Sequence, residues 1–348
     1  MWFRWRKPPD ALCERNLQVL SLISVNYNKE SVLQDFFDSI YSNGFDDFEL
    51  IFIDDCSTDG SVNIARNYPC IIIRNEHNIG PAASRNIGSK IAKGSVLVFT
   101  DTDITIDPGG LALINKHFTQ NKAKAMFGKL AFPPLRNTRI GRFWLYDEEE
   151  ACHYGGVRTG MVNCWSSTLG AIDRELFLSF GGFNELFKGA DIEDHELAAK
   201  ILEHHQVYYD EKLTFHHCYP STWLVIKKMF TRSKMFAGSK SIKVYRDKSW
   251  FSSHRNAGFL LSAVITFAVI FSAIGLFFFP AKASVIALSL VALVLIKVIH
   301  HRRMLRTVLG QEGFAFAAYV FFMQYLTSNS AIAGFASGLL SRKGHTDG

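Results

Sequence analysis

The chain lacks the sequence patterns of several common protein classes. Its six cysteines are scattered along 348 residues and contain no C-x-x-C pair, which argues against a zinc ribbon or a disulfide-rich scaffold and fits a reducing compartment. No G-x-x-x-x-G-K-[ST] segment is present, and no G-x-G-x-x-G follows the first predicted strand. Neither a P-loop nucleotide hydrolase nor a dinucleotide-binding enzyme is therefore expected. Disorder is also excluded, because 48% of the residues are hydrophobic and only 20% are charged.

Acidic residues are scarce in the last third of the chain. Residues 221–348 contain 16 Lys and Arg but only three Asp and Glu, whereas residues 1–220 contain 22 basic and 29 acidic residues. A uniformly basic nucleic-acid-binding protein would not show this division, so we expect no nucleic-acid partner. We interpret the chain as an acidic soluble domain followed by a basic region that binds membrane lipids.

The basic region contains three long apolar segments. Residues 257–279 carry no charge, and as a helix they would rise about 34 Å, enough to cross a hydrocarbon core of about 30 Å. Residues 282–299 predict a second span, with Lys297 close enough to its end to reach the surface. Residues 313–340 are also uncharged but contain several polar side chains. For this third segment two interpretations stay open, a membrane span or a helix in the interface.

The sequence between residues 221 and 256 predicts helices that lie on the membrane surface. Nine Lys and Arg alternate there with aromatic residues, a mixture typical of segments on an anionic leaflet. The chain is therefore expected to be a multi-pass protein of the inner or plasma membrane. By the positive-inside rule, the domain that precedes the basic segment is expected in the cytoplasm. Residues 1–17 are expected to form a small amphipathic segment without the apolar core of a signal peptide, and residues 341–348 a tail.

Residues 18–220 are expected to form an α/β domain. Short apolar runs alternate with helical patterns, which predicts strands at residues 19–25, 48–53, 70–74 and 96–100, and helices at residues 31–41, 59–67 and 81–92. Such alternation predicts a mostly parallel sheet with helices on both faces. Ligands of such sheets bind at the carboxyl ends of the strands.

Polar segments follow each of these predicted strands. Asp103 offers a hard oxygen ligand to Mg²⁺ or Mn²⁺, and Arg85 with a helix N-terminus suits a diphosphate. Each segment has an ordinary explanation when it is taken alone, and Asp59 is expected to be a helix cap. Together they present the acidic, basic and aromatic groups that a nucleoside diphosphate with a divalent cation requires.

Five motifs in this order resemble those of family 2 glycosyltransferases with the GT-A fold. They are IDDCSTDGS at 53–61, NIGPAASRN at 78–86, TDTD at 100–103, GGFNE at 181–185 and EDHEL at 193–197. The pair His216 and His217 falls where that family carries a metal-linked histidine. The resemblance covers about residues 18–236. It implies a GT-A domain, a mostly parallel sheet flanked by helices, that transfers a sugar from a nucleotide-diphosphate donor with the help of Mn²⁺ or Mg²⁺.

The resemblance also implies a role for each matching residue. The implied donor-binding residues are Tyr27 and Asp55 at the nucleobase, Arg85 and Asn86 near the diphosphate, Asp101 near the ribose or sugar, and Glu193 of the EDHEL motif.

The implied metal ligands are Asp103 and one of the two histidines, His216 or His217. Asp194 would be the general base of an inverting displacement, although an aspartate at the start of a helix is also a plausible cap. Asn184 and Glu196 depart from the usual aspartates of their motifs, which bears on specificity more than on chemistry.

The acceptor is the least determined part of the prediction. A hydroxyl on a membrane lipid-linked glycan or glycolipid is favoured, as in cell-envelope assembly, because Asp194 would then have a proton to remove. A polyprenyl phosphate acceptor and an inactive, transferase-like membrane scaffold are the alternatives. A processive synthase is disfavoured by the absence of Q-x-x-R-W and by the short helical region.

Two further segments keep two interpretations each. The acidic run at residues 147–150, close to Trp144 and Tyr146, either faces the acceptor or forms a solvated loop. Arg232 either contacts a phosphate or only attracts the membrane surface.

Overall fold

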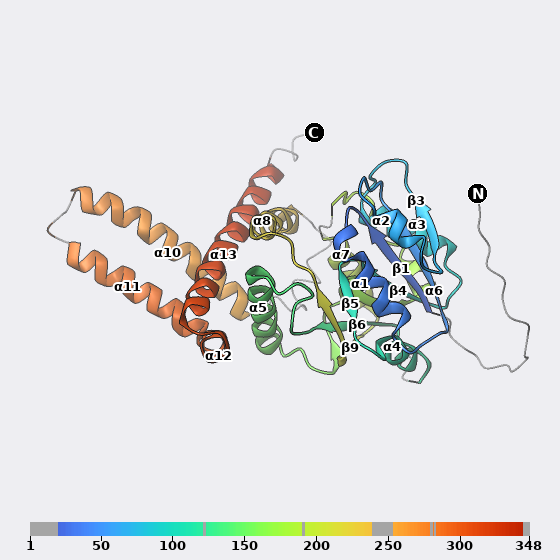
Figure 1. Cartoon of the computed structure of the whole chain (residues 1–348). Coiled ribbons are helices and arrows are strands. Elements are labelled where there is room, and N and C mark those ends of the chain that lie inside the picture. Colours follow the sequence, from blue (N-terminus) through green and yellow to red (C-terminus); the bar gives the residue numbers. More distant parts are fainter. Residues whose placement is uncertain are drawn as a thin grey trace, which may run out of the picture.

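The computed structural model describes residues 20–120, 123–189, 192–238, 253–278, 281 and 283–343. These residues form an α/β domain and a group of C-terminal helices, two of which project away from the domain as a hairpin (Figure 1). The predicted N-terminal segment, residues 239–252 of the predicted interface region and most of the predicted tail lie outside the described residues.

The first half of the sheet follows the predicted strand–helix alternation. Its strands are β1 (Leu20–Asn26), β2 (Phe48–Asp54), β3 (Ile71–Arg74) and β4 (Val96–Asp101), which pair in parallel in the order β3-β2-β1-β4. The intervening helices are α1 (Glu30–Tyr41), α2 (Ser61–Ala65) and α3 (Pro81–Ile91). Helix α2 is shorter than predicted. Asp59 is not the N-cap that was expected, because that position of α2 is Gly60. Its carboxylate nevertheless accepts the N–H groups of Ser61 and Glu30, the first residues of α2 and α1.

The second half of the sheet makes it mixed rather than mostly parallel. It contains β5 (Ile104–Ile106), β6 (Ala125–Leu130), β7 (Gly160–Val162), β8 (Leu169–Asp173) and β9 (Val207–His217), and the order continues β4-β8-β6-β9-β5 with β7 also on β9. Strand β8 runs antiparallel to β4, and β5 antiparallel to β9. The last pairing sets His217 opposite Ile104, the residue after Asp103. This register brings the end of the domain back to the loop that follows β4.

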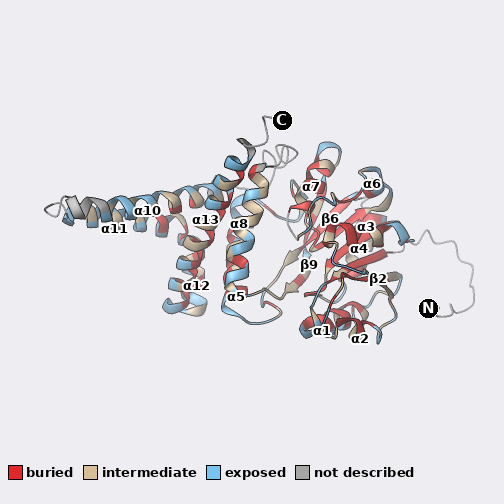
Figure 2. Cartoon of the chain, turned by 90° about the horizontal axis from the view of Figure 1, so that it is seen from above, coloured by how far each residue is buried: buried red, intermediate tan, exposed pale blue. Residues whose placement is uncertain are grey.

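The core lies on both faces of the sheet. Ile23 and Phe99 belong to one buried cluster, and their neighbours Leu22 and Val98 to the other, as the alternation of side chains along a strand requires. Helices α3, α6 (Arg174–Ser179) and α7 (Glu193–His204) accompany the first cluster, and α1 and α4 (Gly110–Thr119) the second. Figure 2 shows the strands as buried and the projecting hairpin as largely exposed.

The acidic run at residues 147–150 is not a solvated loop. It lies in α5 (Arg139–Gly155), where Arg255 Nη2 is 2.5 Å from Asp147 Oδ2 and 3.8 Å from Glu148 Oε2. The side chain of His301 contacts that of Glu150 at 2.7 Å, and both are buried. The loop interpretation was wrong because the partners come from more than 100 residues further along the chain, where no local pattern reveals them.

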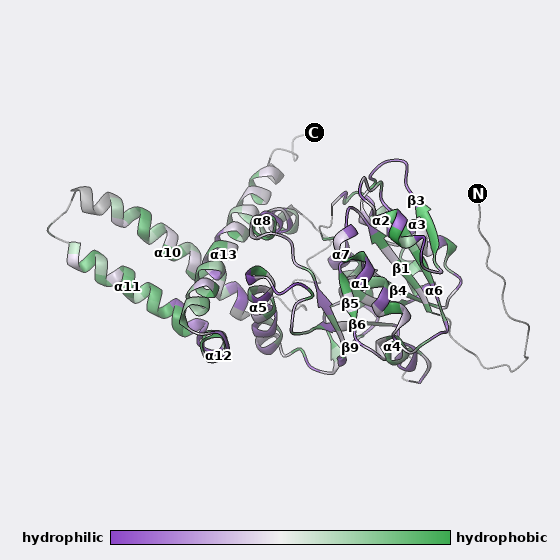
Figure 3. Ribbon diagram, in the orientation of Figure 1, coloured by the Kyte–Doolittle hydropathy of each residue, from purple (hydrophilic) through white to green (hydrophobic). Residues whose placement is uncertain are grey.

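The C-terminal helices are α8 (Thr222–Gly238), α10 (Ser253–Phe278), α11 (Ala283–His300), α12 (Arg302–Glu312) and α13 (Phe314–Lys343). Within the described residues, two segments are long and apolar enough to cross a membrane, Arg255–Ala273 and Ala283–His300. Only 17% and 6% of these segments are buried inside the protein. They form the projecting hairpin, and Figure 3 shows little hydrophilic colour on it except near its base.

Helix α13 packs along α8 and runs across the base of the hairpin (Figure 1). Its Gly334 and Gly338 lie directly on the backbone of α8, where an added Cβ would stand 2.1 Å from the Phe230 carbonyl oxygen and 2.2 Å from that of Lys234. It buries polar side chains, among them Gln324 and Ser328, inside the helical group. The third apolar segment of the sequence is therefore a packed helix set crosswise to the hairpin.

We expect Arg255→Met to destabilise the protein by about 3–5 kcal/mol. The substitution would leave the Asp147 and Glu148 carboxylates largely shielded from solvent and without the cation that pairs with them. The measurement is the thermal unfolding temperature in detergent. Arg302→Met, at an exposed position of α12, is the matched control and should unfold like the parent. Equal unfolding temperatures for Arg255→Met and the parent would contradict the assigned role of this ion pair.

Candidate active site

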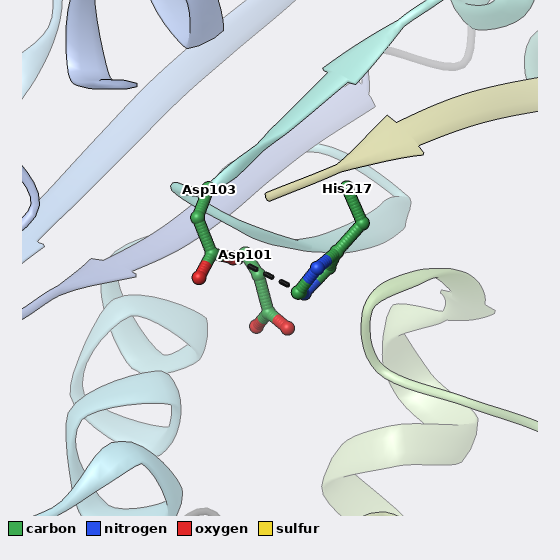
Figure 4. A group of neighbouring side chains, drawn as sticks. All are labelled: Asp101, Asp103 and His217. Atoms are coloured by element: carbon green, nitrogen blue, oxygen red, sulfur yellow. Dashed lines mark ion pairs between the residues drawn. The ribbon is translucent and has the colours of Figure 1, made fainter. Parts of the chain in front are cut away.

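Two aspartates and a histidine meet at the carboxyl end of β4. Asp101 ends β4, Asp103 precedes β5, and His217 ends β9. One ligand atom of each lies within 4.8 Å of the others, and His217 Nε2 is 3.4 Å from Asp103 Oδ1 (Figure 4). The turn is anchored by Thr102, whose hydroxyl donates to the Asn26 side-chain oxygen at 3.2 Å. Local geometry and the β5–β9 pairing together assemble this cluster.

The cluster fits a divalent cation. Carboxylate oxygens suit Mg²⁺ and Mn²⁺, and a neutral imidazole nitrogen is a further ligand that Mn²⁺ accepts readily. Burial lowers the pKa of His217, although the charge of Asp103 opposes this effect. The ring is therefore neutral at physiological pH. Burial alone would raise the pKa of Asp103, but the Lys29 ammonium and, at the acidic pH where Asp103 would take up a proton, a protonated His217 lower it overall. Asp103 is therefore an ionised carboxylate beside a neutral imidazole.

Of the two histidines that the resemblance allowed, the structure brings His217 to the aspartates. His216 points to the other side of β9, as neighbouring residues of a strand do. Its ring nitrogens lie 2.6 Å from the Pro133 carbonyl oxygen and 3.0 Å from Asp107 Oδ1. His216 thus has two partners of its own, away from Asp101 and Asp103.

Arg85 connects the metal cluster to Glu193, the residue before Asp194. Its Nη2 donates to Asp101 Oδ1 and its Nη1 to Glu193 Oε1, both at 2.9 Å, and the side chain is buried. The guanidinium also lies 5.5 Å from the centre of the Phe183 ring. Because both terminal nitrogens are occupied by carboxylates, Arg85 positions the start of α7 against the end of β4.

Asp194 is the second residue of α7, so it is not the N-cap, which is Ile192. Its Oδ1 accepts the N–H of His195 at 2.9 Å. Burial alone would raise the pKa of Asp194, but the charges of His195, Arg232 and Arg85 lower it overall. The side chain is therefore an ionised base at neutral pH, and it lines the same cavity as Asp101 and His217.

Three predicted donor-binding residues, Tyr27, Asp55 and Asn86, do not line the cavity that contains Asp101 and Asp194. Tyr27 is half exposed just beyond β1. Asp55 is buried, and its carboxylate accepts the N–H groups of Ile79 and Gly80 at 2.9 Å, which shapes the loop before α3. The Asn86 side chain both donates to the Phe183 carbonyl and accepts from its N–H, at 2.9 Å each, and so holds the 181–185 turn. Their contacts with a donor stay predictions.

A cavity of about 910 Å³ joins the site to the base of the hairpin. At one end it is lined by Arg85, Asp101, Glu193, Asp194 and His217. At the other end it is lined by Glu148 and Glu149 of α5, Arg255 and Phe259 of α10, and Arg303 of α12. Helix α8 also contributes to the lining, among others with Lys228, Arg232 and Phe236. Among the described residues, the cavity lining does not include Tyr27, Asp55, Asn86, Asp103 or His216.

Three cations at the site carry little or no sequence signal. Lys228 and Arg232, one turn apart on α8, both face the cavity, and of these the sequence indicated only Arg232. Lys29 Nζ lies 2.6 Å from Asp103 Oδ2. The position of Lys29 in the loop after β1 was the signal that could have found it, because that loop ends at the same sheet edge.

Part of this chain is similar to proteins of a known family. Residues 21–169 match the family model described as Glycosyl transferase family 2. An uncharacterized glycosyltransferase of Haemophilus influenzae is 27% identical over 189 residues, 53% of this chain and 62% of the relative. A poly(ribitol-phosphate) beta-glucosyltransferase of Bacillus spizizenii is 32% identical over 119 residues, 32% of this chain and 19% of that protein. This chain therefore spans less than two thirds of either relative.

A solved structure shares the fold. The mannosyltransferase PcManGT from Pyrobaculum calidifontis, in complex with GDP-Man and Mn²⁺, superposes with a TM-score of 0.55 at 15% identity, over 93% of this chain and 88% of that one. The predicted resemblance to family 2 glycosyltransferases is thus confirmed for residues 21–169.

We expect His217→Ala to weaken Mn²⁺ binding in the presence of GDP or UDP by roughly 10–100-fold, because one of the three clustered ligand side chains is removed. The electron paramagnetic resonance signal of free Mn²⁺ measures this binding. His216→Ala is the matched control and should bind Mn²⁺ like the parent. Equal losses of Mn²⁺ affinity in the two variants would show that His217 is not the histidine ligand of the metal.

Proposed function

We propose that the chain is a metal-dependent inverting glycosyltransferase that moves a sugar from a nucleotide-diphosphate donor to a hydroxyl group of a membrane lipid-linked glycan or glycolipid. The observation that carries this proposal is the single cavity with Asp101, Asp194 and His217 at one end and Arg255 and Phe259 of the hairpin at the other. A soluble acceptor would need no such connection to an apolar hairpin.

The donor end of the cavity has the charges that the reaction needs. Asp101, Asp103 and His217 would hold Mn²⁺ or Mg²⁺, which supplies positive charge to the leaving diphosphate when it is bound. Lys228 and Arg232 face the same space and would offset the remaining negative charge. By analogy with the family, Tyr27, Asp55, Asn86 and Glu193 would complete the donor site, with Asp55 and Asn86 acting through the loops that they hold.

Asp194 would take the proton of the acceptor hydroxyl. An ionised carboxylate is needed because an alcohol is a weak nucleophile until its proton is removed, and a positioned base typically contributes ~10²–10⁴ in rate. Arg85 fixes this base relative to Asp101 through Glu193. Single displacement from the side of Asp194 would invert the configuration of the anomeric carbon.

The membrane part of the proposal rests on the hairpin and its surroundings. Helices α10 and α11 would span the bilayer, while α8, α12 and α13 would lie at its surface with residues 221–256 as the interface region. Exposed Trp223 at the start of α8 and the cationic Arg302 and Arg306 of α12 suit the headgroup layer. The domain formed by residues 18–220 would then lie in the cytoplasm.

The names of relatives favour cell-envelope assembly. A poly(ribitol-phosphate) beta-glucosyltransferase acts, by its name, on poly(ribitol phosphate), and we propose an acceptor of related kind on a lipid carrier for this chain. A polyprenyl phosphate is the second candidate, because Lys228 and Arg232 would also suit a phosphate at the acceptor side. We would interpret the chain as an inactive scaffold only if it consumes no nucleotide-sugar donor.

The test is nucleotide release by the detergent-purified protein from a panel of nucleotide sugars, with Mn²⁺ or Mg²⁺ and a membrane lipid extract. Release from one donor that depends on metal and extract supports the proposal and names the donor. Silence across the panel, without metal-dependent nucleotide binding, supports the scaffold instead.

Asp194→Asn should lower the release rate with the lipid extract by ~10²–10⁴ while it leaves nucleotide binding unchanged, because only proton removal is lost. Since the pKa of Asp194 is lowered below that of an ordinary aspartate, protonation of Asp194 should add no acidic limb to the parent rate down to about pH 5. Release by the Asn variant at the parent rate would remove the base and indicate a phosphate acceptor.

Reporter fusions should place both ends of the hairpin on one side of the membrane. In Escherichia coli, an alkaline phosphatase fused after residue 281, between α10 and α11, should be active, and one fused after residue 343, at the end of α13, should be inactive. This pattern follows if only two helices cross and α13 lies along the surface. An active phosphatase at 343 would instead make α13 a third span.

A further inference from the structure

The metal cluster already contains a cation that belongs to the protein. The Lys29 ammonium lies 2.6 Å from Asp103 Oδ2, while the other carboxylate oxygen faces His217 at 3.4 Å. Asp103 is buried, so water does not compete effectively for its oxygens. One oxygen of the carboxylate that is best placed to bind a metal is therefore already paired with an ammonium.

The loop that carries Lys29 holds its backbone but leaves its side chain able to move. The backbone N–H of Lys29 donates to the Ser61 hydroxyl at 3.3 Å, and Lys29 directly precedes α1. The Lys29 side chain is 38% exposed, against 12% for that of Asp103. A lysine side chain with an open flank can swing away without any change of the backbone.

Charges at this end of the cavity are balanced before any ligand binds. Three carboxylates and three cationic side chains line it, and the Asp103–Lys29 pair lies beside the lining, so that four carboxylates stand with four cations: Asp101, Asp103, Glu193 and Asp194, with Lys29, Arg85, Lys228 and Arg232. A divalent cation alone adds positive charge next to the Lys29 ammonium. A diphosphate alone adds negative charge next to four carboxylates. The two together add almost no net charge, so joint entry is electrostatically favoured over entry of either one.

We infer that Lys29 is an internal counter-ion of Asp103, which competes with the metal for this carboxylate and releases it when the diphosphate arrives to accept the ammonium. Lys29 would then couple the binding of the metal to that of the nucleotide, and by linkage each ligand strengthens the other by the same factor. Lys29 is a positioning residue in this scheme, since it acts through Asp103. The inference rests on the proposed donor class.

The experiment measures Mn²⁺ binding to the detergent-solubilised protein through the resonance signal of free Mn²⁺, without nucleotide and with GDP or UDP. A protein-free titration corrects for Mn²⁺ held by the nucleotide itself. In the parent, the nucleotide should tighten Mn²⁺ binding by roughly 5–150-fold, the usual range of such coupling.

Lys29→Met keeps the length of the side chain and removes its charge. It should bind Mn²⁺ without nucleotide about tenfold more tightly than the parent, and the effect of the nucleotide should shrink by a similar factor. Lys29→Arg, which retains the charge, should restore much of the coupling. Lys124→Met is the matched control, because Lys124 forms a 2.8 Å ion pair with Asp173 remote from the cluster, and it should behave like the parent.

An unchanged or weaker Mn²⁺ affinity of folded Lys29→Met without nucleotide would overturn the inference, and the thermal unfolding temperature establishes that the variant is folded. If Lys29→Met shows this result while the parent still binds Mn²⁺ and releases nucleotide, the proposed function stands and only the counter-ion role of Lys29 is disproved. If the parent binds no Mn²⁺ under any of these conditions, the metal in the proposed function falls as well.

Discussion

A buried arginine holds the two halves of the candidate site together. Arg85 donates to Asp101 on one side and to Glu193 on the other, both at 2.9 Å. Asp101 belongs to the metal cluster, and Glu193 directly precedes Asp194. The separation between the cation site and the base is therefore set by one guanidinium, whose planar, two-pronged geometry a lysine could not reproduce. Removing it would leave the buried Glu193 carboxylate and the partly exposed Asp101 carboxylate facing each other.

A second set of ion pairs extends the site toward the hairpin. Arg255 and His301 of the C-terminal helices meet the acidic run of α5, and the same helix lines the cavity that contains Asp194. Apolar contacts alone would let helices slide, whereas a buried charge is satisfied in only one arrangement. The acidic domain and the basic C-terminal region thus fit each other at defined points. This fixes where an acceptor carried at the membrane surface would meet the donor, and the Lys29–Asp103 pair gives the donor end its own charge balance.

Much of the fold could be predicted from the sequence because its signals are local. Apolar runs of strand length, such as those at residues 48–53 and 96–100, separate helical patterns, and the observed strands differ from the predicted ones by a residue at most. The polar segments after β1, β2 and β4 fall at one sheet edge for the same reason. The two apolar helices that could cross a membrane were also predicted, since length and composition suffice for them.

Only the tertiary structure decided which of these polar residues act together. The β5–β9 register selects His217 over His216, and it depends on strands more than 100 residues apart. Likewise, the sequence placed Asp55 and Asn86 at the right edge of the sheet but not the backbone groups that they hold. The sequence by itself thus determined the kinds of elements and the chemistry at the sheet edge, because both follow from neighbouring residues. The pairing of charges, from Lys29 to the acidic run of α5, was decided by distant segments that meet only in the folded chain.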